Sequence, residues 1–158
     1  GCDRLRGAVR VQASVAVGSV MYLFDENTSY KLISFMNRIG IRDADSLVRA
    51  YVTGTKDEDL IPRLARDRHL LVTNDQKMKT EHRALLQQYG VRVLFLPEGY
   101  SEWGRLGQAE FIIGRWRRIT SQIDALPNIQ LLRVNKYGRV SALPLRVKRN
   151  RRSVIARS

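Results

Sequence analysis

The architecture of this chain is indicated most clearly by the segment Leu70-Leu71-Val72-Thr73-Asn74-Asp75, an apolar run that ends abruptly in polar residues. Its length and composition are typical of a buried strand followed by a turn. The same pattern occurs earlier, where Val20-Met21-Tyr22-Leu23-Phe24 stops at Asp25-Glu26-Asn27. A third apolar run covers residues 91–96 and is halted by Pro97. These three runs predict the buried strands of one sheet.

Segments with helical spacing of apolar residues separate the three runs. Asp57 stands where the cap of the helix before the second run belongs, and the helix after that run ends at Gly90. Residues 43–52 are less regular and are compatible with a short helix capped by Asp43 or Asp45. The order strand, helix, helix, strand, helix, strand predicts an α/β fold with a central parallel sheet flanked by helices.

The last third of the chain adds a long helix and a hairpin. Residues 106–125 are amphipathic, and because Trp116 lies on the apolar stripe we expect it in the core. Residues 129–147 are compatible with a hairpin that turns at Lys136-Tyr137-Gly138. The expected divisions are a leader or extension (1–20), a domain (21–125) and a basic hairpin and tail (126–158).

Positive charge is concentrated toward the C-terminus. The formal net charge is +13. Residues 21–100 carry 12 Lys or Arg and 11 Asp or Glu, whereas residues 101–158 carry 13 and 3, with no acid after Asp124. Such a block favours a polyanion partner, RNA or DNA, through phosphate attraction. A solubilising tail, or a tail that pairs with an acidic protein, stays open as an alternative.

Composition excludes several classes of protein. No apolar run approaches the ~20 residues that cross a bilayer, so no membrane partner is expected. Cys2 is the one cysteine. It rules out an internal disulfide and a zinc site built on several thiolates, and it favours a cytoplasmic location. Polar residues dilute the mildly apolar stretch 11–20, so we interpret residues 1–20 as a leader or upstream extension rather than a secretory signal.

Three aspartates are expected to gather at one edge of the sheet. Asp25 and Asp75 follow two of the strands, and Asp57 begins a helix at the same end. Carboxylates placed together repel one another, and a hard divalent cation, Mg²⁺ or Mn²⁺, relieves that repulsion. Aspartates also cap helices and turns, so each has a structural explanation by itself. The metal prediction therefore depends on the set of three.

The segment from Met21 to about Tyr100 resembles a PIN-like domain, in the short branch that includes VapC-type toxins. The resemblance is carried in order by Leu23-Phe24-Asp25-Glu26-Asn27, Asp57-Glu58-Asp59-Leu60 with Ala65, and Leu71-Val72-Thr73-Asn74-Asp75. Residues 81–97 and, later, Phe111 with Trp116 also resemble this branch. Each motif alone is a weak signal, whereas their order and spacing together are fairly specific.

The resemblance implies a Mg²⁺-dependent (or Mn²⁺-dependent) endoribonuclease that hydrolyses RNA phosphodiester bonds. It implies a catalytic and metal-binding role for Asp25, Asp57 and Asp75. Secondary roles at the site, as outer ligands or as polar neighbours of the three acids, are expected for Glu26, Asn27, Glu58, Thr73 and Asn74. It also implies a cognate antitoxin protein, and a homodimer is possible because PIN-like domains often pair. Many members carry a further glutamate between the first two acids, where this chain offers only Asp43 and Asp45. An aromatic residue often stands three positions after the last acid, where this chain has Met78.

Basic residues in three parts of the chain are candidates for phosphate contacts, and only the first group lies near the expected site. On the helix after Asp75 they are Lys77, Lys79, His82 and Arg83; on the long helix they are Arg115, Arg117 and Arg118. In the tail they are Lys148, Arg149, Arg151 and Arg152. A solvated helix face explains the first group equally well.

Three functions stay open at this point: a toxin-like endoribonuclease, a PIN-like nuclease of RNA processing or repair, and a catalytically silent nucleic-acid-binding module. Metal dependence separates the third from the other two. Growth arrest on expression, relieved by a neighbouring gene product, separates the first from the second. The RNA target, cut-site preference, number of metals and oligomeric state do not follow from the sequence.

Overall fold

The protein is built around one six-stranded sheet with the strand order β2-β1-β3-β4-β5-β6. The computed structural model describes residues 20–51 and 54–144. The strands are β1 (Tyr22–Phe24), β2 (Ala44–Ser46), β3 (Leu70–Thr73), β4 (Arg92–Phe95), β5 (Leu131–Val134) and β6 (Val140–Ala142). Every neighbouring pair is parallel except β5 and β6, which are antiparallel. The predicted α/β fold with a central parallel sheet is confirmed.

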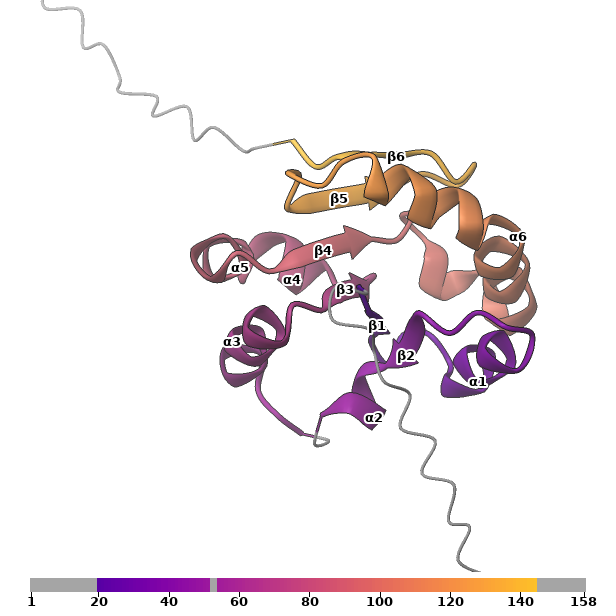
Figure 1. Ribbon diagram of the computed structural model, residues 1–158, viewed down its shortest axis with the longest axis horizontal. Coiled ribbons are helices and arrows are strands. Elements are labelled where there is room, and N and C mark those ends of the chain that lie inside the picture. Colours follow the sequence, from indigo (N-terminus) through magenta and orange to yellow (C-terminus); the bar gives the residue numbers. More distant parts are fainter. Residues whose placement is uncertain (1–19, 52–53, 145–158) are drawn as a thin grey trace, which may run out of the picture.

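Helices cover both faces of this sheet (Figure 1). They are α1 (Tyr30–Arg38), α2 (Leu47–Ala50), α3 (Asp57–Asp67), α4 (Gln76–Thr80), α5 (Arg83–Tyr89), the 3-10 turn η1 (Tyr100–Glu102) and α6 (Gly104–Asp124). α1 and α6 pack on one face, and α3, α4 and α5 on the other. No helix in the described ranges is long and apolar enough to span a membrane.

The two faces of the sheet have separate cores because side chains alternate along each strand. Leu70 and Val72 pack with α1 and α6, whereas Leu71 packs with α3 and α5. Trp116 of α6 is buried, and its ring centroid lies 5.1 Å from that of Tyr22. The expected core position of Trp116 is therefore confirmed.

The prediction for residues 43–52 is wrong in its first half. Residues 44–46 form the edge strand β2, and the helix that follows is the single turn α2. The backbone N–H of Tyr22 donates to the carbonyl of Asp43 over 2.7 Å, and the Asn37 side chain donates to the carbonyl of Ala44 over 2.9 Å. Pairing with β1 therefore overrides the weak strand preference of Ala and Asp.

Two helix boundaries also differ from the expectation. Lys56 is the N-cap residue of α3, and Asp57 is its first helical residue. The single helix expected after Asp75 is two helices, α4 and α5, with His82 at the junction between them. The expected end at Gly90 is confirmed, and that glycine has a left-handed φ of 68°. These changes keep Asp57 at the start of α3, at the same end as Asp75.

The C-terminal hairpin joins the main sheet. β5 pairs in parallel with β4, and β6 then forms the outer edge beyond β5. The turn at residues 135–138 is closed by a hydrogen bond from Gly138 N–H to the Asn135 carbonyl over 2.9 Å. Within the expected range of 129–147, residues 131–142 form a hairpin that shares one sheet with the strands of residues 21–98, and residues 145–147 lie outside the described residues.

Candidate active site

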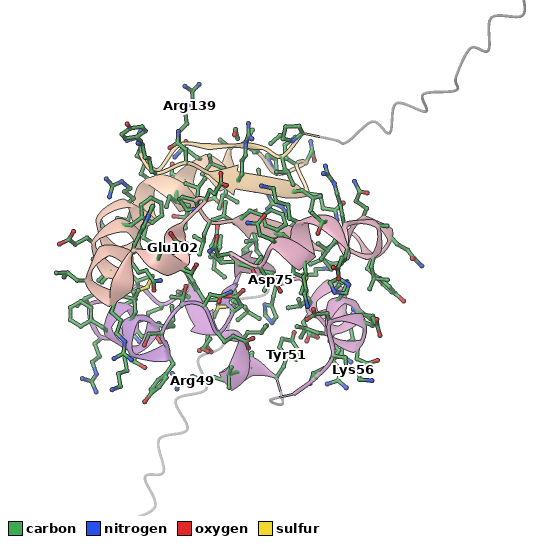
Figure 2. All side chains as sticks on the ribbon, turned by 180° about the vertical axis from the view of Figure 1, so that it is seen from behind. Arg49, Tyr51, Lys56, Asp75, Glu102 and Arg139 are labelled. Carbon is green, nitrogen blue, oxygen red and sulfur yellow. The ribbon has the colours of Figure 1, made fainter. Side chains whose placement is uncertain are left out.

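The carboxyl ends of β1 and β3 open into a pocket of about 230 Å³. Asp25, Asp57 and Asp75 all line this pocket, although they come from three separate segments of the chain. Asp75 lies near the centre of the molecule in the view of Figure 2. The structure therefore brings the three predicted acids to one place, which we call the acidic pocket.

Asp25 is the most buried of the three acids, with 9% of its surface exposed. Its carboxylate accepts hydrogen bonds from the Asn27 backbone N–H (3.1 Å), the Asn27 side-chain amide (3.3 Å) and the Thr73 hydroxyl. Burial raises the pKa of Asp25 to about 6, and these hydrogen bonds oppose the rise. Burial in the pocket therefore disfavours the charged form of Asp25.

Thr73 connects two of the acids. Its hydroxyl donates to Asp25 and accepts from the Asp75 backbone N–H over 2.9 Å. The Asp75 carboxylate in turn accepts from the Lys77 backbone N–H over 2.8 Å and so caps α4. The last residue of β3 thus fixes the positions of both strand-end acids relative to each other.

Asp57 reaches the acidic pocket from the first turn of α3. One of its carboxylate oxygens lies 3.3 Å from Nε2 of His82. The sequence predicts His82 as a phosphate contact or surface residue, whereas in the structure its side chain is 20% exposed and faces an acid. The junction between α4 and α5 places it there.

The acidic side chains of the pocket are of the type that binds a hard divalent cation, but they are not close enough together to hold one as they stand. All the acidic donors are carboxylate oxygens, the ligands that Mg²⁺ and Mn²⁺ favour. Within residues 20–51 and 54–144, however, no group of three His, Cys, Asp or Glu side chains is close enough to hold a metal ion. Binding would therefore require Asp57 or Asp75, both partly exposed, to turn toward the buried Asp25.

The secondary candidates divide into two groups. Glu26, Asn27 and Thr73 line the acidic pocket. Glu58 is exposed on α3 and Asn74 lies beyond Thr73, and neither is among the residues that line the pocket. The side-chain oxygen of Asn74 is buried and has no hydrogen-bond partner in the described part of the chain.

Neither possible fourth acid contributes to the pocket. Asp43 accepts a hydrogen bond from the Trp116 indole over 3.0 Å. Asp45 accepts from the Ser46 backbone N–H over 2.8 Å and lies 3.9 Å from Arg49. Both therefore have structural partners around β2.

The predicted basic residues are dispersed. Lys77 and Lys79 lie on α4 beside the acidic pocket, whereas Arg83 donates to the carbonyl of Pro144. On α6, Arg115 stacks over the Phe111 ring at 5.3 Å, and Arg117 and Arg118 are exposed on the helix that covers the opposite face. Lys148, Arg149, Arg151 and Arg152 lie outside the described residues.

Sequence reasoning missed a buried pair beside Asp25. The hydroxyls of Thr28 and Tyr100 lie 3.1 Å apart, and Tyr100 is fully buried. Burial raises the pKa of Tyr100 to about 12, with a smaller contribution from the nearby Asp25 charge. The closeness of Thr28 to the Asp25-Glu26-Asn27 motif is the one signal in the sequence that points to this pair.

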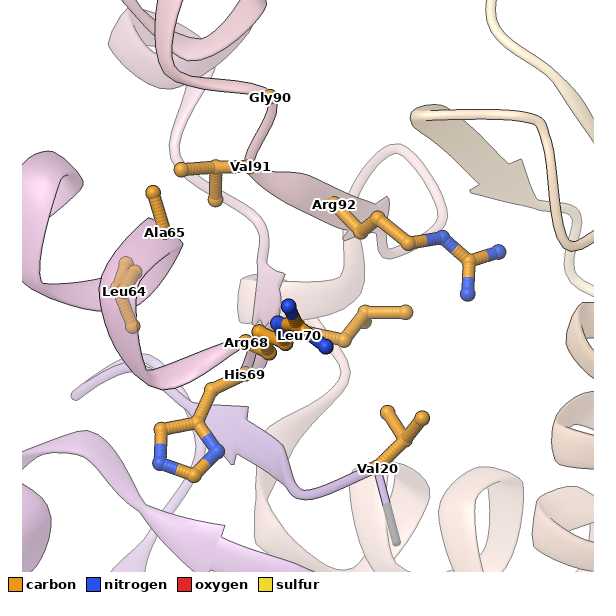
Figure 3. A pocket seen from close by; sticks show the side chains of 9 residues that line it. All are labelled: Val20, Leu64, Ala65, Arg68, His69, Leu70, Gly90, Val91 and Arg92. Atoms are coloured by element: carbon orange, nitrogen blue, oxygen red, sulfur yellow. The ribbon is translucent and has the colours of Figure 1, made fainter. Parts of the chain in front are cut away.

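A second pocket lies at the opposite, amino ends of β3 and β4 (Figure 3). It measures about 290 Å³ and is lined largely by apolar side chains such as Leu64 and Val91. Arg92 at its rim donates to the carbonyls of Leu126 and Ile129. This cavity contains no acid among its lining residues and lies away from the acidic pocket.

Comparison with known proteins identifies the family. A family model described as "PIN like domain" matches residues 21–98. Searches of curated proteins and of solved structures found no match. PIN domains are generally nucleases and typically use divalent metals. The matched segment contains β1, β3 and all three acids of the acidic pocket. Residues 21–98 of this chain belong to the PIN-like domain family.

Proposed function

We propose that the protein is a divalent-metal-dependent endoribonuclease that hydrolyses RNA phosphodiester bonds at the acidic pocket. The observation that carries the proposal is the convergence of Asp25, Asp57 and Asp75 on one pocket at the carboxyl ends of β1 and β3. Mg²⁺ or Mn²⁺ bound there would activate water and stabilise charge on the scissile phosphate. RNA is favoured as substrate by the net charge of +13 and by the family resemblance.

Each acid has a distinct part in this proposal. Asp25 is held by Thr73 and Asn27, so it provides the fixed ligand. Asp75 is tied to the backbone of α4 by its cap. Rotation about its side-chain bonds would bring its second oxygen toward Asp25. Asp57 contacts His82, which can hold or release that carboxylate. Glu26 lines the pocket and is exposed, which suits an outer ligand.

The experiment that tests the proposal is cleavage of a structured RNA with Mg²⁺, with Mn²⁺ and with EDTA. Asp75→Asn and Asp57→Asn are compared with Asp59→Asn, which removes the same charge from an exposed position in the first turn of α3. We expect metal-dependent cleavage that both pocket variants lose and the control retains, with folding checked by circular dichroism. Equal activity in Asp57→Asn and Asp59→Asn would contradict the proposed role of Asp57.

A second function is favoured by a specific observation. The described residues contain no three acidic, His or Cys side chains close enough for a metal. That spacing suits a catalytically silent nucleic-acid-binding module. Folded protein that binds RNA and takes up no Mn²⁺ in isothermal titration would establish this alternative over the nuclease.

The biological setting of the nuclease is a further part of the proposal. The resemblance to VapC-type toxins favours a cytoplasmic toxin restrained by a cognate antitoxin, whereas a role in RNA processing or repair needs no such partner. Induced expression should arrest growth in the first case, and the arrest should disappear in Asp75→Asn. Normal growth with an active purified enzyme would favour the processing role.

A further inference from the structure

A polar groove of about 380 Å³ lies beside the acidic pocket, between α4 and the β5–β6 hairpin. Its floor is formed where β4 ends, by Phe95, Leu96 and Pro97. Three cationic side chains line it: Lys79 of α4, Arg133 of β5 and Lys136 of the hairpin turn. Arg133 and Lys136 lie beyond the segment that matches the PIN-like family. We call this feature the hairpin groove.

Positive charge is in excess in the hairpin groove. Glu98 is the single acid among its described lining residues. Within residues 20–51 and 54–144, none of the three cations forms a salt bridge. Arg133 and Lys136 are exposed. Exposed cations of this kind can bind the phosphate oxygens of a ligand, and no other charged side chain of the protein has to lose its hydration when they do.

An aromatic ring adjoins these cations. Tyr137 is 65% exposed, and the Lys136 ammonium lies 5.1 Å from the centre of its ring. An exposed ring beside basic side chains is the arrangement on which single-stranded bases stack, whereas the bases of a duplex are already stacked on one another. The hairpin groove therefore favours single-stranded RNA over a duplex.

The hairpin that carries these residues is rigidly placed. The Asn135 side chain accepts from the backbone N–H groups of Tyr137 (3.0 Å) and Arg139 (2.9 Å). Gln122 of α6 donates to the Gly138 carbonyl over 2.8 Å and accepts from the Val140 N–H over 3.0 Å. Ordering this turn on binding therefore costs little conformational entropy.

Strand register aligns the hairpin groove with the acidic pocket. Thr73 pairs with Phe95, Phe95 pairs with Arg133, and the three lie in one row across β3, β4 and β5. Neighbouring strands are about 4.8 Å apart, so the row from Thr73 to Arg133 covers about 10 Å. Met78 lines the acidic pocket and the next residue, Lys79, lines the hairpin groove.

We propose that the hairpin groove binds the single-stranded RNA that flanks the scissile phosphate, through phosphate contacts to Arg133 and Lys136 and a base stacked on Tyr137. The inference rests on the proposed ribonuclease function. It assigns the substrate-binding surface to residues that the family match does not include.

The test measures binding of a fluorescent single-stranded RNA oligonucleotide by anisotropy, over a range of salt, in the full chain carrying Asp75→Asn and in EDTA. Arg133→Gln with Lys136→Gln should bind more weakly, and its log–log salt slope should fall by about 1.4, because each single-strand phosphate that is no longer neutralised removes about 0.7. Lys31→Gln with Arg38→Gln, two exposed charges on α1, is the matched control and should keep the slope.

A second pair of variants separates stacking from charge. Tyr137→Ala should weaken binding about fivefold or more at an unchanged salt slope. Tyr30→Ala removes a ring that is 61% exposed on α1 and should have no effect. Equal losses in the hairpin and α1 variants, or none in either, would overturn the proposal, as would tighter binding of an acidic peptide of matched charge.

Failure of the groove and failure of the nuclease give different results. Metal-dependent cleavage by the wild-type chain, with Arg133→Gln/Lys136→Gln binding RNA normally, rejects the groove and leaves the nuclease standing. RNA binding that depends on the hairpin residues, without cleavage under Mg²⁺ or Mn²⁺, rejects the nuclease and retains the groove. A chain that does not bind RNA rejects both.

Discussion

Asp25 is the residue at which stability and function conflict. Its carboxyl is buried, and its pKa of about 6 exceeds the ordinary value of 3.8. Folding therefore favours the protonated form. The resulting stabilisation is fully present below pH 3.8 and is lost as the pH rises through about 6. At neutral pH the ionised group costs roughly 3 kcal/mol, because each pH unit between the two pKa values corresponds to about 1.4 kcal/mol.

Asp25→Asn should therefore raise the melting temperature in EDTA at pH 7.5 and change it little at pH 4. The amide is neutral at both pH values and its oxygen still accepts from Thr73, so the charge penalty is removed. The amide NH2 replaces the oxygen that accepts from the Asn27 N–H, and the loss of that hydrogen bond offsets part of the gain. Addition of Mg²⁺ should stabilise the wild type and not the variant, because ligand binding to the native state raises stability. Thermal scans at both pH values check this. Destabilisation at pH 7.5 would contradict it.

Thr73 is a residue whose importance depends on one hydroxyl. Thr73→Val keeps the shape but removes one of the hydrogen bonds that the Asp25 carboxylate accepts and leaves the Asp75 N–H without its partner. We expect destabilisation of about 1–3 kcal/mol in urea. The acidic limb of the pH–rate profile should move to higher pH, because a hydrogen bond that lowers the pKa of Asp25 is removed. Thr73→Ser keeps the hydroxyl and should behave like the wild type in both measurements.

At the scale of elements, the buried strands β1, β3 and β4 were predictable and the edge strand β2 was not. Leu70-Leu71-Val72 is fully buried on both faces, and such a strand is a continuous apolar run in any sequence. Ala44-Asp45-Ser46 has no strong pattern, because its place is set by pairing with Tyr22-Leu23-Phe24. Local propensity cannot reveal a strand whose stability comes from its neighbour.

Asn37→Ala tests how β2 is held. The Asn37 amide donates to the carbonyls of Ile41 (2.8 Å) and Ala44 (2.9 Å), which lead into the strand. Loss of both hydrogen bonds should lower the free energy of unfolding by roughly 2 kcal/mol, measured by urea denaturation. Ser34→Ala on the same helix is the control and should be near neutral. Equal midpoints for the two variants would show that β1 pairing alone places β2.

At the scale of the whole molecule, the acidic pocket was predictable and the hairpin groove was not. The topology rule that gathers strand ends needs only the order of elements, and it brought Asp25, Asp57 and Asp75 together. The closeness of Lys79 and Arg133 requires the register of β5 against β4, which no local pattern contains. The contact of His82 with Asp57 likewise depends on the break between α4 and α5.

Long-range charge is a property of the entire chain. Residues 148–158 lie outside the described residues and include Lys148, Arg149, Arg151 and Arg152. Deletion of this segment should weaken RNA binding and reduce the salt slope by about 0.7 for each phosphate that the protein no longer neutralises, while Mn²⁺ uptake at the acidic pocket is unchanged. Anisotropy and metal titration on the truncated chain measure the two effects. An unaltered slope would show that the tail serves another purpose.

The row Thr73–Phe95–Arg133 also restricts which changes of length this protein can accept during evolution. Leu131 and Leu132 serve opposite faces of the sheet, and Arg133 follows them. A one-residue shift of β5 against β4 would exchange these faces, sending Arg133 toward the core and Leu132 toward the groove. Point substitutions can change the charge of the hairpin groove one side chain at a time. A change of length that moved β5 by one residue against β4 would instead alter the core and the binding surface in a single event.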